Sequence, residues 1–296
     1  MPLKGTLLKT LYPKTEMRKM GDADILINIE QYDTIRSIMK NLGYTEKYES
    51  DHEFTWEKKP VHIELHKRLI PSYNKDYYRY YGDGWKTAKP QEEYAFRYRM
   101  DPDDEMIYLF THFAKHYRDA GIGIRHLVDL WVFRKNHPDL NEEYICRELK
   151  KLRLLEFYEN ILHTLRCWFE DEPGDEKTEF ITRHIFTSGE YGSAETARLS
   201  CVLRDAGNER SAESVKSKRF FRLLFPEYTE MSQKYRILQK TPVLLPVLWI
   251  VRILGQMFRF RKMYRFVKNR LNFKAEEVSV YQQALHYVGL DFNFSE

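Results

Sequence analysis

The chain has 296 residues, of which 43% are hydrophobic, and its formal net charge at pH 7 is +4; this length supports one large domain or two modest domains with a buried core. Three cysteines without CxxC spacing exclude a disulfide framework and a zinc knuckle, and the longest uncharged apolar run, at 241–251, is well short of the ~20 residues that span a bilayer. We therefore expect a soluble globular protein of the cytoplasm that carries no signal peptide.

The charge is unevenly distributed along the chain. Residues 216–274 hold fifteen Lys and Arg against two Glu, so the remainder is acidic overall. Such a basic stretch attracts nucleic acid, anionic lipid or an acidic protein partner, although a solvated helical surface is the commoner explanation of a charge run. The sequence contains no strong nucleic-acid-binding signal.

The N-terminal third predicts short helices and strands in alternation. Leucines recur at helical spacing from residue 3 to residue 11, and Pro13 ends that helix because the residue before a proline avoids the α region. Apolar and polar residues then alternate as they do in a half-buried strand. In chain order, the predicted elements are a helix at 3–12, a strand at 23–29, a helix at 30–42, and strands at 52–59 and 61–69.

Beyond about residue 100 the strand signals stop and helical patterns take over. The predicted helices are 103–119, 124–136, 141–153, 155–170, 177–187, 193–206 and 211–224. This pattern predicts an α+β fold, in which a small mixed β-sheet with flanking helices precedes a mostly helical C-terminal region. We divide the chain into an α/β domain at 1–100, a helical domain at 101–210 and a basic helical extension at 211–296.

Three acidic residues lie on the predicted strands at positions that favour metal binding. Asp22 and Asp24 are two residues apart, so their side chains point the same way. Glu64 lies on another strand with His62 and His66 on its face, and it can reach the same space. Carboxylates grouped in this way suit Mg²⁺ and phosphoryl or nucleotidyl transfer, although aspartates also flank strands at turns for purely structural reasons.

A glycine turn precedes this acidic motif. Lys4-Gly5-Thr6 lies where the first helix begins, and exposed amides at a helix N-terminus are well placed to hold phosphates. Glycine permits the close approach that such binding needs. Lys4 and Arg18 also carry the right charge for triphosphate oxygens.

These motifs together resemble a known family. LKGTLLKTLYPKTEMRKMGDADILI at 3–27, followed by GY at 43–44 and IELH at 63–66, is similar to the uncharacterised nucleotidyltransferase family of the polymerase-β-like nucleotidyltransferase superfamily. The similarity continues through residues 112–133 and 244–252 and so covers most of the chain. Relatives are expected to carry helices before the LKG motif.

The resemblance implies a fold, a reaction and a set of site residues. It implies a small mixed sheet, a Mg²⁺-bound NTP, with Mn²⁺ as the second candidate ion, and transfer of a nucleoside monophosphate to a hydroxyl acceptor with loss of pyrophosphate. Asp22 and Asp24 would ligate both ions, and Glu64 would hold the catalytic ion and help to activate the acceptor hydroxyl. The nucleotide-binding residues that it implies are Lys4, Gly5, Thr6, Arg18 and Gly21.

The chain departs from the family pattern at two positions. The superfamily usually has Gly-Ser where this chain has Gly5-Thr6, and threonine keeps the hydroxyl. The third acid is Glu64 where the family more often has aspartate, and the extra methylene shifts the carboxylate by ~1.5 Å, which changes the metal spacing. The replacement of aspartate by Glu64 therefore bears on the metal that is preferred and on activity, and ligand binding is the firmer expectation.

Five further residues are candidates for substrate contact, each with a plainer alternative. His112 and His116 lie four apart in a predicted helix, but HFAKH lacks the glutamate of HExxH, so packing or hydrogen-bonding histidines are favoured over metal ligands. Arg125 and Asp129 face the cleft in one interpretation and form an i,i+4 ion pair in the other. His66 is a partner of Glu64 or part of a strand edge.

The aromatic stretch at 73–85 either stacks a base or a sugar or, more often, covers a core.

The C-terminal segment 241–271 joins an apolar half to a basic, aromatic half. It resembles an interfacial helix resting on anionic lipid or binding an acidic partner, and packing against the helical domain is the alternative. Two other functions therefore stay open beside the enzyme: a catalytically degenerate nucleotide-binding module and an adaptor peripheral to the membrane. The acceptor cannot be read from the sequence.

Overall fold

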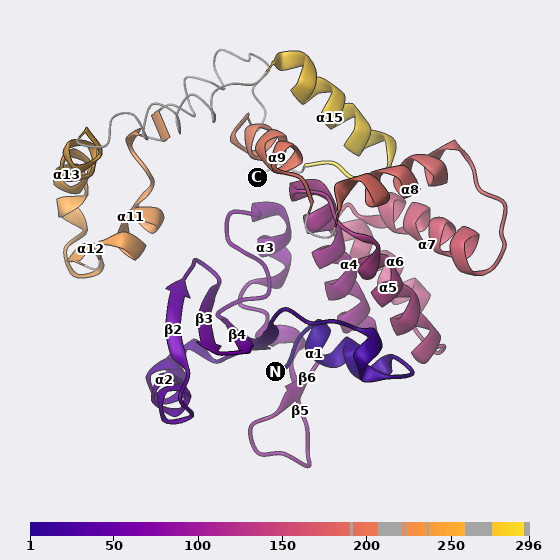
Figure 1. Ribbon diagram of the computed structural model, residues 1–296, viewed down its shortest axis with the longest axis horizontal. Helices are drawn as coiled ribbons and strands as arrows, with labels where there is room; N and C mark the ends of the chain where they lie inside the picture. Colours follow the sequence, from indigo (N-terminus) through magenta and orange to yellow (C-terminus); the bar gives the residue numbers. More distant parts are fainter. Residues whose placement is uncertain (190–191, 207–220, 223, 236, 258–273, 293–296) are drawn as a thin grey trace. The chain divides into compact units, whose positions relative to one another are not determined.

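The computed structural model describes residues 1–189, 192–206, 221–222, 224–235, 237–257 and 274–292, and it confirms an α+β fold (Figure 1). The chain forms two compact units. Unit 1 comprises Met1–Ser193 and His286–Ser295, and unit 2 consists mainly of Ala194–Leu285. The three-part division of the chain stays a prediction.

Unit 1 contains a mixed four-stranded sheet. Its strands are β1 (Ala23–Leu26), β2 (Thr45–Glu49), β3 (Glu53–Lys58) and β4 (Val61–His66), in the order β1-β4-β3-β2. β1 and β4 run parallel, and β3 is antiparallel to both β4 and β2. The sequence predicted β1, β3 and β4 but missed β2, because this edge strand reads TEKYE and is exposed at every position except Glu46.

One face of this sheet is the hydrophobic core of the N-terminal region. The buried members of the core are Ile27, Met39, Phe54, Trp56 and Leu65. α2 (Tyr32–Asn41) covers this face, and the ring of Tyr32 stacks on that of Phe54 with centroids 3.7 Å apart. Because successive side chains of a strand alternate, Asp24, Glu53 and Glu64 are left on the opposite face.

The N-terminal residues extend the edge of β1. The backbone N–H of Leu26 donates to the carbonyl of Met1 over 2.8 Å, and that of Leu3 donates to the carbonyl of Asp24 over 3.0 Å. The chain then turns into α1 (Gly5–Leu8) and the 3₁₀ helix η1 (Lys9–Leu11), so the helix predicted at 3–12 forms as two short pieces. This pairing fixes the start of α1 beside Asp24.

The tyrosine-rich stretch after the sheet forms a helix. α3 (Lys75–Tyr81) buries Tyr77 and Tyr81, and the Tyr81 hydroxyl lies 2.9 Å from that of Thr111. A two-stranded sheet of β5 (Lys89–Pro90) and β6 (Tyr98–Arg99) follows. The rings of Tyr77 and Tyr81 therefore pack in the core of unit 1.

Five helices complete unit 1 at the predicted positions. They are α4 (Pro102–Asp119), α5 (Ile124–Asn136), α6 (Glu142–Lys151), α7 (Leu155–Phe169) and α8 (Glu176–Ser188). Pro102 stands at the first turn of α4, where its missing N–H costs nothing, and Asp103 complements the helix dipole there. α4 is buried along most of its length, so it is the central helix of the unit.

The helices after residue 193 for which the structure describes bounds belong mainly to unit 2. They are α9 (Ala194–Ala206), α11 (Tyr228–Lys234), α12 (Ile237–Lys240), α13 (Leu245–Met257) and α15 (Ala275–Tyr287). The helix predicted at 211–224 lies almost entirely outside the described residues, and so does the basic part of segment 241–271. Among the described helices, none combines the length and the apolar character needed to cross a bilayer.

Candidate active site

The structure brings the three acidic residues of the sequence motif to one face of the sheet. Asp24 on β1 and Glu64 on β4 are directly opposite each other in the parallel register. Asp22 stands just before β1 and lines the same cavity as Asp24 and Glu64. The strand alternation read from the sequence is therefore correct, and the pattern places the acids opposite the hydrophobic core.

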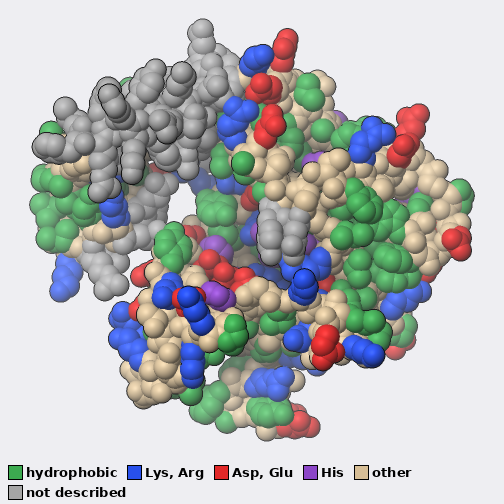
Figure 2. Space-filling view, viewed as in Figure 1, with side chains coloured by type: hydrophobic (Ala, Val, Ile, Leu, Met, Phe, Trp, Pro, Cys, Tyr) green, Lys and Arg blue, Asp and Glu red, His purple; other side chains and the backbone are tan. Residues whose placement is uncertain are grey.

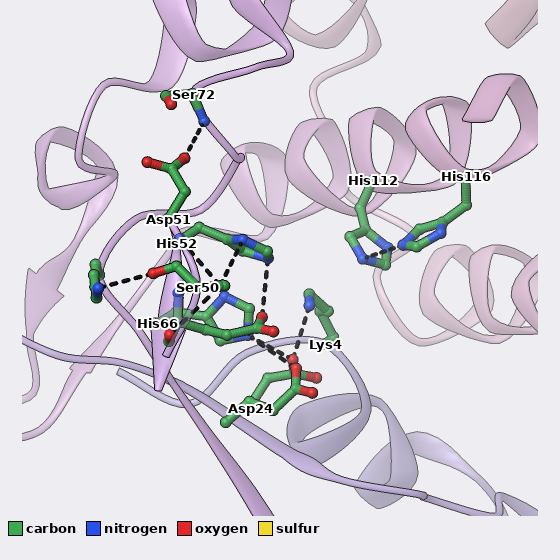
Figure 3. Close-up of polar contacts among 12 residues, drawn as sticks. Lys4, Asp24, Ser50, Asp51, His52, His66, Ser72, His112 and His116 are labelled. Atoms are coloured by element: carbon green, nitrogen blue, oxygen red, sulfur yellow. Dashed lines mark hydrogen bonds and ion pairs between the residues drawn. The ribbon is translucent and has the colours of Figure 1, made fainter. Parts of the chain in front are cut away.

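Asp24 is the most buried of these acids and is held by two basic side chains (Figure 3). The ammonium of Lys4 donates to Oδ1 over 2.8 Å, and Nε2 of His66 lies 2.8 Å from the same oxygen. Asp24 is 6% exposed and His66 is 1% exposed. His66 therefore positions Asp24 from inside the protein and is not among the residues that line the cavity.

Lys4 reaches Asp24 from a backbone conformation that side chains rarely adopt. Its φ of 45° and ψ of −121° lie in a region populated almost only by glycine, which costs on the order of 1–3 kcal/mol. Its carbonyl accepts the N–H groups of Leu7 and Leu8, so α1 holds the turn in place. Strain of this kind is concentrated at functional sites, where the surrounding structure fixes it.

The pKa values of Asp24 and Asp22 are shifted in opposite directions. Burial raises the pKa of Asp24, but the charges and hydrogen bonds of Lys4 and His66 outweigh burial and hold that pKa well below its ordinary value. The pKa of Asp22 is raised by burial and then by the nearby carboxylates of Asp24 and Glu64. Asp24 is therefore firmly ionised, and the crowding at Asp22 favours a cation among the three carboxylates.

The donor set fits a divalent cation. One ligand atom from each of Asp24, Glu64 and His66 lies within 4.8 Å of the other two. Carboxylate oxygens are the ligands preferred by Mg²⁺ and Mn²⁺. The ammonium of Lys4 on Asp24 shows that this position already favours positive charge.

A cavity of about 420 Å³ lies against the acidic face. Its volume is within the ~300–1,000 Å³ of small-molecule sites. Opposite the acids, the wall comes from α4 and α5, and its polar lining residues are His112, Lys115, His116, Arg125, His126 and Asp129. In Figure 2, acidic side chains in red lie beside histidine side chains in purple near the middle of the face shown.

The histidines of α4 form a hydrogen-bonded pair. Nε2 of His116 lies 3.1 Å from Nε2 of His112, so one ring donates and the other accepts. Burial lowers the pKa of both well below the ordinary value, and burial together with Arg125 lowers the pKa of His126 to about 4. All three rings are therefore neutral at pH 7, and His112 and His116 both pair with each other and line the cavity.

Arg18 and Asp129 meet across the cavity wall. Nε and Nη2 of Arg18 donate to the two oxygens of Asp129 over 2.9 and 2.8 Å, and the Tyr12 hydroxyl donates to Oδ1 over 2.7 Å. Gly5 makes room for this guanidinium, because a Cβ there would stand 2.6 Å from Nη1. Asp129, one helical turn after Arg125, is thus held by partners from the start of the chain.

Of the two remaining predicted site residues, Gly21 lines the cavity and Thr6 does not. Gly21 lines the cavity, and no atom approaches within 4 Å of where its Cβ would stand. The Thr6 hydroxyl is buried and has no hydrogen-bond partner among the described residues. A buried hydroxyl without a partner is costly.

Four polar residues of the cavity were not predicted from the sequence: His52, Glu53, Lys115 and His126. The alternation of β3 carries a signal for Glu53, because Phe54 and Trp56 point to the core and Glu53 must point to the acidic face. Lys115 and His126 carry no such signal, since packing of α4 and α5 decides which of their polar residues meet the cavity.

Comparison with known proteins gives one match. A family model described as "Uncharacterised nucleotidyltransferase" matches residues 1–170, which is more than half of the chain and contains every candidate residue above. No curated protein and no solved structure matches the chain.

Proposed function

Because this chain belongs to the uncharacterised nucleotidyltransferase family, we propose that it transfers a nucleoside monophosphate from an NTP to a hydroxyl acceptor in a Mg²⁺-dependent reaction. The observation that carries this proposal is the placement of Asp24 directly opposite Glu64 in the β1–β4 register, with Asp22 beside them on the cavity. Three carboxylates at one wall of a ligand-sized cavity are suited to this chemistry.

Asp22, Asp24 and Glu64 would hold the cation, with Mn²⁺ as the alternative to Mg²⁺. When bound, the cation neutralises triphosphate charge and lowers the pKa of the attacking hydroxyl. The acceptor oxygen forms a bond to the α-phosphorus, the bond to the bridging oxygen breaks, and pyrophosphate leaves. Glu64 is the most exposed of the three carboxylates that approach His66, at 24% against 16% for Glu53 and 8% for Asp24. It would assist in removing the hydroxyl proton.

The turn at the start of α1 would hold the triphosphate. Lys4 already lies within hydrogen-bonding distance of Asp24 and is the cation placed to shift onto a phosphate once a metal neutralises that carboxylate. Thr6 belongs to this proposed set because of the family motif alone, since it does not line the cavity. Gly5, Arg18 and Gly21 complete the proposed nucleotide-binding set.

The opposite wall would contact the acceptor or the base. His112 and His116 are neutral and can both donate and accept hydrogen bonds there, and Arg125 adds positive charge. His66 and Asp129 would act by positioning, because each already binds another member of the site. The chemistry of this wall does not single out one acceptor.

Label transfer tests the proposal. The full chain is incubated with each α-³²P NTP, Mg²⁺ or Mn²⁺, and candidate hydroxyl acceptors, beside the variants Asp22→Asn/Asp24→Asn and Asp33→Asn/Asp139→Asn. Asp33 and Asp139 are exposed and lie outside the cavity lining, so they control for the loss of two charges. We expect metal-dependent label transfer that only the Asp22/Asp24 variant loses.

Two results would contradict the proposal. If the Asp22/Asp24 variant keeps the parent's metal-dependent NTP affinity, the acids are not the metal site. Tight NTP binding without transfer to any acceptor supports the degenerate nucleotide-binding module instead. Circular dichroism of each variant establishes that the helical content is unchanged.

A further inference from the structure

A second cluster of metal-ligating side chains lies next to the acidic motif. His52 immediately precedes β3, Glu53 begins β3 and His66 ends β4, and Glu53 and His66 are directly opposite each other in the register. One ligand atom from each lies within 4.8 Å of the other two. Figure 3 shows the rings of His52 and His66 close together beside Asp24.

The separations suit a small coordination sphere. Nε2 of His52 lies 2.9 Å from Oε2 of Glu53, and Nε2 of His66 lies 4.0 Å from the same oxygen. A tetrahedral ion with bonds of about 2.0–2.1 Å needs ligand atoms about 3.4 Å apart. The two observed distances lie on either side of that value. Nε2 of His66 also lies 2.8 Å from Oδ1 of Asp24, so closing the site exchanges that hydrogen bond for a bond to the ion.

The turn before β3 fixes the orientation of His52. Its Nδ1 lies 3.3 Å from the hydroxyl of Ser50, which also accepts the backbone N–H groups of His52 and Glu53 over 3.3 and 3.1 Å. A partner at one ring nitrogen selects the tautomer that leaves the other nitrogen for a metal. Ser50 therefore gives His52 the outer contact that metal-binding histidines usually have.

We propose that His52, Glu53 and His66 form a binding site for a nitrogen-preferring divalent cation, of which Zn²⁺ fits best. Two imidazoles and one carboxylate are a common zinc ligand set, whereas Mg²⁺ selects oxygen ligands. On binding, Nε2 of the neutral His52 ring coordinates the ion, while the ring proton stays on Nδ1 beside the Ser50 hydroxyl. This site differs in ligands and in metal preference from the Asp22, Asp24 and Glu64 site, although its ligand His66 also lies within ligand distance of Asp24 and Glu64.

Zinc binding to the full chain tests this inference. Equilibrium dialysis with Zn²⁺ is carried out in excess Mg²⁺, after the free thiols of Cys146, Cys167 and Cys201 have been alkylated to prevent their binding the metal. We expect His52→Ala and Glu53→Gln each to bind one equivalent less than the parent. His62→Ala should match the parent, because His62 is exposed and lies outside the cluster.

Further variants separate this inference from the proposed enzyme activity. Ser50→Ala should weaken zinc binding by about 10- to 100-fold, as loss of an outer contact does at other metal sites. Asp22→Asn should abolish label transfer yet keep the zinc equivalent. Equal zinc binding by the parent and His52→Ala, or displacement of the bound zinc by Mg²⁺, would overturn the inference. A chain that binds zinc as expected but transfers no nucleotide would count against the proposed enzyme activity and not against the zinc site.

Discussion

Replacing Asp129 by Asn should strongly destabilise unit 1. The carboxylate of Asp129 pairs with Arg18 through two hydrogen bonds of 2.8 and 2.9 Å, and both side chains are almost fully buried. Asn keeps the volume but leaves the guanidinium as a buried charge without a counterion. Removing one partner of a buried ion pair costs about 3–5 kcal/mol, and we expect the lower end because the Asn oxygen still accepts one hydrogen bond.

Urea unfolding followed by circular dichroism measures this cost. Tyr12→Phe removes only one hydrogen bond to the same carboxylate and should cost less, about 1.5–3 kcal/mol. The double variant Arg18→Met/Asp129→Leu removes both charges and should recover most of the stability, because apolar replacements of buried ion pairs are often neutral. A loss of about 0.5 kcal/mol or less for Asp129→Asn, the range of surface substitutions, would refute the reasoning.

The same double variant tests whether Arg18 contacts nucleotide. If Arg18 binds phosphate as proposed, the folded double variant should lose NTP affinity that Tyr12→Phe retains. Unchanged affinity in the double variant would give Arg18 a positioning role behind Gly5 instead. Isothermal titration with a non-hydrolysable NTP measures both affinities.

Three further predictions concern the glycine turn and the acids. Gly5→Ala should lower the free energy of unfolding in urea by about 1–3 kcal/mol, because the added Cβ would press on the Arg18 guanidinium. Gly21→Ala should keep a free energy of unfolding close to that of the parent, because no atom lies within 4 Å of its Cβ position. Equal losses in the two variants would contradict the close approach of Arg18 to Gly5. Lys4→Met should raise the pKa of Asp24, measured by NMR titration of the carboxyl carbon, because the ammonium is the largest of the influences that lower it; an unshifted titration would contradict this. The raised pKa of Asp22 means that protons displace a bound cation at a higher pH than at an ordinary aspartate. Mn²⁺ affinity, followed by electron paramagnetic resonance, should therefore fall on acidification at a higher pH than an ordinary aspartate would give. Asp22→Asn should flatten that dependence, and an unchanged slope would contradict it.

Much of the fold could be predicted because it depends on local periodicity. α4 and α5 have the bounds expected from helical spacing to within one residue, and β1, β3 and β4 were found from alternation. β2 was missed because an exposed edge strand needs no apolar alternation, and its pairing with β3 is a tertiary choice. The helix within 73–85 was hidden by aromatic residues, which have no strong helical signal.

The sequence by itself determined which face of the sheet carries the acids. The side-chain period of a strand is two, so apolar residues at 25, 27, 63 and 65 require Asp24 and Glu64 to point away from the core. Only the tertiary structure decided that Lys4 and His66 hold Asp24, and that Arg18 binds Asp129 across a separation of 111 residues. Such pairings depend on how distant elements pack, and a periodic pattern within one element carries no information about the element that it will meet.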